Sequence, residues 1–177
     1  YFSKSKGCKV WELEGREYVD MSLMGVGTNI LGYGHPEVDE AVMSTVKSGN
    51  MSSLNCPEEV YLAEKLIDMH NWADEARFAR SGGEANSVAV RIARAASGRD
   101  NVAICGYHGW HDWYIANTDL NSGIPKFNQK LAHSFNYNDL DSLEKIFKKN
   151  PNKVSCVIME PLTILEPTCY GPKNCKK

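Results

Sequence analysis

The chain has 177 residues, with 20 Lys and Arg against 22 Asp and Glu, so its formal net charge is -2. Its hydrophobic content of 42% and charged content of 24% are ordinary for a folded globular protein and exclude a disordered tail or a fibrous repeat. The weak acidity predicts no nucleic-acid partner, because such proteins usually gather basic residues on one face. No apolar run reaches membrane-spanning length, so we expect no membrane association.

The cysteines indicate a reducing compartment. They are spread along the chain with no C-x-x-C pair, so neither a zinc site nor a thioredoxin-type motif is predicted. Cys105 and Cys156 lie inside apolar runs that predict buried strands, where a free thiol behaves as a small hydrophobe. We therefore expect reduced thiols and a cytoplasmic protein. The cysteines are Cys8, Cys56, Cys105, Cys156, Cys169 and Cys175.

The first part of the chain predicts two short strands followed by two helices. Residues 10–13 and 18–21 have strand character and flank a turn-like break that contains a glycine. Residues 36–48 and 57–69 predict helices, and each begins on a proline, which suits the first helical position. Gly49 follows the first helix and predicts its end.

The second part alternates strands with helices. This order is typical of a parallel α/β sheet with helices on both faces. Asp139 is a good N-cap for the last helix, and residues 106–132 interrupt the alternation with a long segment of the kind that often carries function. We expect strands at residues 77–80, 102–105 and 154–159, and helices at residues 84–96 and 139–149.

A glycine pair between a predicted strand and a predicted helix forms a candidate phosphate site. In Ser81-Gly82-Gly83-Glu84, the serine and glutamate have the spacing of a capping box, in which each side chain binds a free backbone N–H. The glycines leave the backbone bare, so an anion can approach the N–H groups at the start of the helix. The alternative is a well-capped helix with a flexible entry and no ligand.

An aromatic cluster follows the predicted strand at residues 102–105. Because ligands of open α/β sheets bind beyond the carboxyl ends of the strands, this cluster and the glycine pair face the same edge. A stacking ring such as Tyr107 beside a phosphate site suits a flat, phosphorylated cofactor, and pyridoxal 5'-phosphate (PLP) has that shape. Two alternatives stay open: His108, His111 and Asp112 could bind a metal ion, and the other aromatic side chains could pack in the core or in an interface.

With both clusters in place, the chain resembles the class III PLP-dependent aminotransferases, and within them enzymes like glutamate-1-semialdehyde aminomutase. The resemblance covers most of the chain. The motifs that carry it are Tyr18-Val19-Asp20, Leu31-Gly32-Tyr33-Gly34-His35-Pro36, Glu59 with Leu62-Ala63-Glu64-Lys65-Leu66, Arg77-Phe78-Ala79-Arg80-Ser81-Gly82-Gly83-Glu84-Ala85, Arg91-Ile92-Ala93-Arg94, Gly98-Arg99-Asp100, Tyr107-His108-Gly109 and Val157-Ile158-Met159-Glu160-Pro161.

The resemblance implies a role for six residues. The glycine-rich turn would hold the phosphate, Tyr107 would stack on the pyridine ring with His108 beside it, and the glutamate of the Glu-Pro turn would lie near cofactor or substrate. Gly83 stands where the aminomutases commonly have Thr, which fits better the aminotransferase branch that includes sugar-modifying members. The implied cofactor-binding residues are Ser81, Gly82, Gly83, Tyr107, His108 and Glu160, and no metal site is implied.

The resemblance also implies a fold and a domain organisation. Residues 1–55 would form a small N-terminal segment with short strands and one helix, and residues 56–177 the first part of the large domain of a fold type I PLP enzyme. The Schiff-base lysine and the acid that protonates the pyridine nitrogen are expected beyond Lys177. The chain begins at Tyr1 rather than Met, so we expect part of a larger enzyme, inactive by itself.

The implied function is transfer of an amino group between small molecules, by an aminotransferase or an intramolecular aminomutase of the glutamate-1-semialdehyde type. A homodimer is expected. The alternatives are a module that binds a cofactor or ligand without catalysis, and a metal-dependent hydrolase that uses His108, His111 and Asp112.

Overall fold

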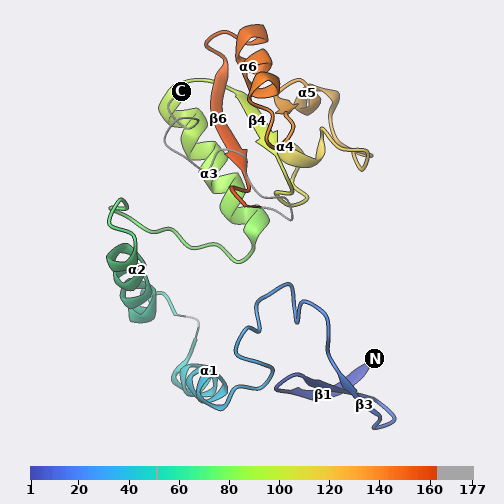
Figure 1. Ribbon diagram of the computed structural model, residues 1–177. Coiled ribbons are helices and arrows are strands. Elements are labelled where there is room, and N and C mark those ends of the chain that lie inside the picture. Colours follow the sequence, from blue (N-terminus) through green and yellow to red (C-terminus); the bar gives the residue numbers. More distant parts are fainter. Residues whose placement is uncertain (51, 163–177) are drawn as a thin grey trace. The chain divides into compact units, whose positions relative to one another are not determined.

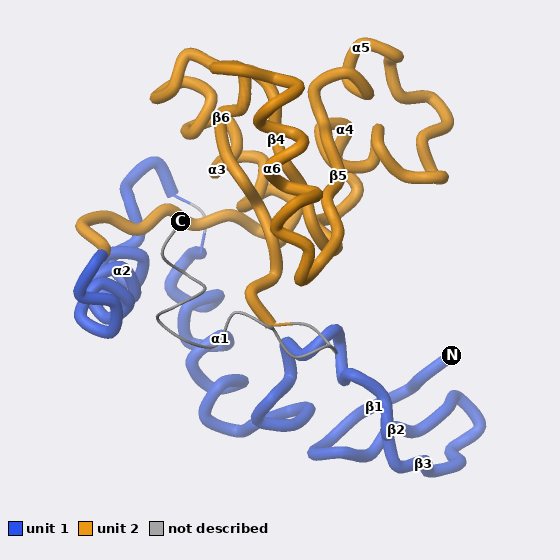
Figure 2. The backbone as a smooth tube through the Cα atoms, turned by 45° about the horizontal axis from the view of Figure 1, so that its top comes forward, with its two compact units in different colours: residues 1–72 blue, residues 73–177 orange. Residues whose placement is uncertain are grey.

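The structure is a computed structural model that describes residues 1–50 and 52–162. The chain divides into two compact units, Tyr1–Trp72 and Ala73–Lys177 (Figure 2). The boundary between residues 55 and 56, which would separate the N-terminal segment from the large domain, stays a prediction. Along the described ranges, no helix combines the length and the apolar character that crossing a membrane requires.

The first unit opens with an antiparallel sheet. Its strands are β1 (Phe2–Lys6), β2 (Lys9–Glu12) and β3 (Glu17–Val19), in the order β1-β2-β3. The last two were predicted, with ends shifted by one or two residues, because each carries apolar residues around a turn. The first was not predicted, since its sequence Phe-Ser-Lys-Ser-Lys has a single apolar residue and no alternation.

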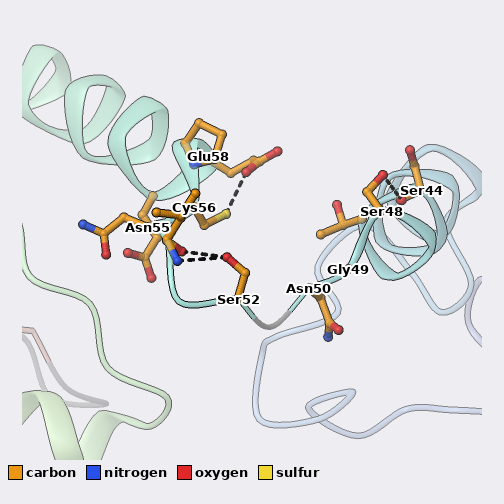
Figure 3. Close-up of a pocket in the computed structure, with 12 residues that line it drawn as sticks. Ser44, Ser48, Gly49, Asn50, Ser52, Asn55, Cys56 and Glu58 are labelled. Carbon is orange, nitrogen blue, oxygen red and sulfur yellow. Dashed lines mark hydrogen bonds between the residues drawn. The ribbon is translucent and has the colours of Figure 1, made fainter.

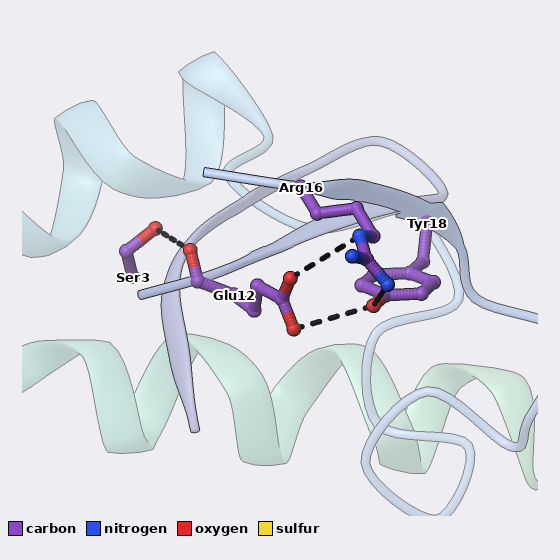
Figure 4. A network of polar contacts seen from close by, with 4 residues as sticks. All are labelled: Ser3, Glu12, Arg16 and Tyr18. Atoms are coloured by element: carbon purple, nitrogen blue, oxygen red, sulfur yellow. Dashed lines mark hydrogen bonds and ion pairs between the residues drawn. The ribbon is translucent and has the colours of Figure 1, made fainter. Parts of the chain in front are cut away.

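A polar network fastens the turn between β2 and β3 (Figure 4). Tyr18 Oη donates to Glu12 Oε2 at 3.2 Å, and Arg16 Nε pairs with Glu12 Oε1 at 3.5 Å. Ser3 Oγ donates to the Glu12 carbonyl oxygen at 3.0 Å, which adds β1 to the group. These contacts are exposed to water, so each adds about 1 kcal/mol or less to stability.

Helices α1 (Pro36–Ser48) and α2 (Pro57–Met69) complete the first unit and confirm the predicted spans. Between the end of α1 and the start of α2 lies an open polar hollow of about 470 Å³ (Figure 3). At its rim the thiol of Cys56 donates to Glu58 Oε2 at 2.7 Å, and this bond lowers the pKa of the Glu58 carboxyl.

The second unit is built on a parallel sheet, as predicted. Its strands are β4 (Asn101–Cys105), β5 (Ala132–Ser134) and β6 (Val154–Met159), in the order β5-β4-β6. Figure 1 shows β4 and β6 side by side. The central strand β4 is buried along its whole length, which explains the apolar sequence of residues 102–105.

Helices cover both faces of this sheet. Successive side chains of β4 point to opposite faces, so each face has its own helix partners. Val102 and Ile104 pack with Val90 of α3 (Gly82–Ser97), while Ala103 packs with Ile146 of α6 (Leu140–Lys149). Helix α6 begins as predicted, since Asp139 Oδ1 accepts from the Ser142 N–H at 2.9 Å. The predicted α/β fold with helices on both faces is therefore confirmed.

Two segments differ from the sequence prediction. Residues 77–80 were predicted as a strand, and this was wrong: they have no strand partner among the described residues, and Phe78 instead lines an apolar hollow with Val88 and Ile92 of α3. The long segment after β4 is not structureless. It holds the short helices α4 (Asp112–Ile115) and α5 (Lys126–Gln129), and then β5.

Candidate functional site

The start of α3 is capped by Ser81. Its Oγ accepts from the Glu84 N–H at 3.3 Å, which is one half of the predicted capping box. The other half differs, since Glu84 Oε2 accepts from the N–H of Arg80 at 2.8 Å rather than from that of Ser81. The two caps still anchor the turn that leads into the helix, and so fix the direction of its first N–H groups.

The first two positions of α3 are Gly82 and Gly83, and their N–H groups have no hydrogen-bond partner within the described part of the chain. Neither residue has a positive φ, and a Cβ added to Gly82 would meet no atom within 4 Å. The backbone conformation therefore does not require glycine at position 82. Its bare surface leaves room for a molecule outside the chain, at the end of the helix that favours anions.

The loop after β4 lies directly on this first turn. Gly109 has φ +104°, and a Cβ there would stand 3.0 Å from Gly83 Cα, so a larger residue would be strained in conformation and tightly packed. Asn86 Nδ2 of α3 donates to the carbonyl oxygen of His108 at 3.3 Å. The structure thus brings together the two predicted clusters, the glycine pair and the aromatic loop.

Tyr107 presents its ring to solvent. The residue is 70% exposed, and its ring meets that of Tyr114 edge to face, with centroids 5.8 Å apart. Tyr114 packs against the core, and burial is the main cause that raises the pKa of its hydroxyl. Tyr107 is therefore held from one side while the rest of the ring is free to stack on a flat ligand.

The side chain of His108 is buried, unlike that of Tyr107. It is only 6% exposed, and its Nε2 donates to the carbonyl oxygen of Cys105 at 2.8 Å, which supports the turn out of β4. This geometry fits a residue that holds the loop in shape. Its predicted place beside a cofactor stays a prediction.

Glu160 follows β6 and lies at the same sheet edge. Its Cδ is 3.5 Å from the position that a Cβ on Gly106 would take. Burial raises the pKa of the Cys105 thiol, and the negative charge of Glu160 adds to this rise. The exposed ring and this carboxylate thus follow two neighbouring parallel strands, β4 and β6, and the approach of Gly109 to Gly83 brings the phosphate candidate to the first of these loops.

The metal alternative finds no support in the geometry. Among residues 1–50 and 52–162, no three His, Cys, Asp or Glu side chains are arranged to hold a metal ion. His108 is bound to the Cys105 carbonyl, and His111 hydrogen bonds through Nδ1 to Ser87 Oγ. Ser87 was not singled out from the sequence. Its signal was its place four residues after Gly83, which puts it on the same face of the helix.

Comparison with known proteins identifies the family. The family described as Aminotransferase class-III matches residues 1–164, so the chain belongs to it. The chain is 34% identical to 3-aminobutyryl-CoA aminotransferase of Cloacimonas acidaminovorans (strain Evry), with 92% of this chain and 38% of that protein covered. It is 31% identical to glutamate-1-semialdehyde 2,1-aminomutase of Anaeromyxobacter dehalogenans (strain 2CP-1), with 92% and 40% covered.

Solved structures agree. The FumI protein of Sphingopyxis sp. MTA144, solved with PLP, superposes with a TM-score of 0.83 at 29% identity, covering 92% of this chain and 39% of that one. The chain thus spans about two fifths of the length of the curated relatives it matches. The resemblance inferred from the sequence is confirmed at the level of family and fold.

Proposed function

We propose that the complete protein is a PLP-dependent enzyme that transfers an amino group between small molecules, and that this chain supplies the part that binds the cofactor's phosphate and ring. One observation carries the proposal. The free N–H groups of Gly82 and Gly83 lie beneath the loop that presents the exposed ring of Tyr107. A phosphate site next to an aromatic surface suits PLP, which the related FumI structure contains.

The residues present fit the cofactor. The N–H groups of Gly82 and Gly83 would donate to phosphate oxygens, and the helix dipole would favour the negative charge. Tyr107 would stack on the pyridine ring, and Ser81 orients the turn through its cap. Glu160 lies beside Gly106, the residue before Tyr107, and would bind there to cofactor or substrate. When bound, PLP supplies an electron sink that stabilises negative charge on the carbon bearing the amine.

The reacting lysine and the acid that faces the pyridine nitrogen belong to the proposal but not to residues 1–177. Both aminotransferases and an aminomutase occur among the relatives, so both remain candidate activities. A module that binds PLP without these two groups is the alternative, and mapping of the lysine in the full-length protein distinguishes the two.

The proposal includes a cytoplasmic homodimer. The cysteines within the described residues are free, which suits a reducing compartment. Helix α1 contains no buried residue and exposes Val38, Val42, Met43 and Val46, so it offers apolar surface for further protein contacts.

Cofactor retention in the full-length protein tests the proposal. Tyr107→Ala should weaken PLP binding about 5- to 150-fold. Stacking of a flat heterocycle, such as a nucleobase, on an aromatic side chain contributes about 1 to 3 kcal/mol. Tyr107→Phe keeps the ring and should bind PLP nearly as well. Phe127→Ala is the control, since Phe127 is 66% exposed and lies on the same segment between β4 and β5. Unchanged affinity in Tyr107→Ala would remove Tyr107 from the site.

A further inference from the structure

The hydroxyl of Ser87 is where three polar groups meet. Ser87 Oγ donates to the Gly83 carbonyl oxygen at 2.8 Å and accepts from Trp113 Nε1 at 2.9 Å. It also hydrogen bonds to Nδ1 of His111. A hydroxyl has one proton, and here Ser87 donates it to the Gly83 carbonyl oxygen. In the bond between Ser87 Oγ and His111 Nδ1, the imidazole nitrogen is therefore the donor.

The partners of Ser87 lie near both parts of the proposed cofactor site, the phosphate-binding turn and the aromatic loop. His111 Nε2 lies 3.4 Å from the position that a Cβ on Gly83 would take, so its imidazole flanks the phosphate side. Trp113 contacts Tyr114 edge to face, with centroids 5.9 Å apart, and Tyr114 contacts Tyr107 at 5.8 Å. One side chain of α3 therefore joins the first turn of the helix to the aromatic rings of the loop.

We infer that Ser87 is a positioning residue that fixes the ring-binding loop relative to the phosphate-binding turn. The inference rests on the proposed function. A ligand with two binding groups gains from the second only if both sites are held at the matching separation. PLP has a ring and a phosphate, so its affinity depends on this separation, whereas a ligand with only one of the two groups is insensitive to it.

Three probes separate positioning from general damage. The affinities of PLP, of pyridoxal without phosphate, and of inorganic phosphate are measured on cofactor-free full-length protein by ligand-induced fluorescence quenching and competition. Ser87→Ala should weaken PLP binding about tenfold, the equivalent of one hydrogen bond. The affinities for pyridoxal and for phosphate should stay within about twofold, because each uses one side of the site.

The chain offers matched controls. Ser97 on the same helix donates to the Ala93 carbonyl oxygen at 2.7 Å but has no partner on the loop, so Ser97→Ala should leave all three affinities unchanged. His111→Asn keeps an N–H near the position of Nδ1 and should retain more PLP affinity than His111→Ala. Trp113→Phe removes the Nε1 bond to Ser87 and keeps an aromatic ring against the core, so it serves if Ser87→Ala does not fold.

The outcomes distinguish failure of the proposed function from failure of the positioning role of Ser87. If the wild-type protein binds no PLP, the proposed function fails, and this inference fails with it. If the wild-type protein binds PLP and Ser87→Ala or Trp113→Phe binds it equally well, the inference alone is overturned. Equal weakening of PLP, pyridoxal and phosphate binding would also overturn it, because that pattern indicates general damage rather than lost alignment.

Discussion

Gly82→Ala should separate the stability of the fold from the binding of the cofactor. Residue 82 is the first position of α3, its φ is not positive, and a Cβ would meet no atom within 4 Å. Alanine there is free of strain and restricts the unfolded chain, so the free energy of unfolding should rise by about 0.4 to 1 kcal/mol.

The same methyl group should impair phosphate binding. In a helix the Cβ is tilted toward the N-terminus, which is the side from which the anion approaches Gly82 and Gly83. Displacing the phosphate from one N–H removes a hydrogen bond to a charged group, worth about 1.5 to 3 kcal/mol. The affinity for PLP should therefore fall about 10- to 150-fold.

The assay combines denaturation of the cofactor-free full-length protein with PLP titration. Gly109→Ala is the contrasting variant: its φ of +104° and the 3.0 Å approach to Gly83 Cα predict a loss of about 1 to 3 kcal/mol in stability. If Gly82→Ala keeps wild-type affinity for PLP, or lowers stability as Gly109→Ala does, the reasoning about the bare helix start is wrong.

Two further changes test the fold that carries the site. Asp139→Ala removes the N-cap bond to the Ser142 N–H and should cost about 1 kcal/mol in urea denaturation, while Asp141→Ala, exposed in the same turn, should cost much less; equal costs would reject the capping role. Burial lowers the pKa of His133, so the unfolded state binds more protons as pH falls below about 6.5, and stability should decline there. Between pH 7 and pH 5, the melting temperature of His133→Gln should fall less than that of the wild-type protein. Parallel curves of melting temperature against pH would contradict this.

The helices were predictable because their signals are local. The prolines at the starts of α1 and α2 and the carboxylate of Asp139 act within one turn of the chain, and the structure places these three helix starts where the sequence indicated. The central strand β4 was predictable because burial on both faces demands an unbroken apolar run.

The failures involve partners distant in sequence. Residues 77–80 look like a strand, yet a strand needs a neighbour, and none pairs with them in the described part of the chain. The contacts of Ser87 with His111 and Trp113 depend on how the loop after β4 packs on α3, and these residues are more than twenty positions apart. Composition and spacing identify the glycine pair and Tyr107 as candidates, but they do not show that Ser87 joins the two.

The most direct test is a crystal structure of the full-length protein with PLP. The proposal predicts phosphate oxygens about 3 Å from the backbone nitrogens of Gly82 and Gly83, with the pyridine ring stacked on Tyr107. It also predicts that the lysine bonded to the cofactor is not among residues 1–177. A phosphate bound away from the start of α3, or a pyridine ring without contact to Tyr107, would contradict it.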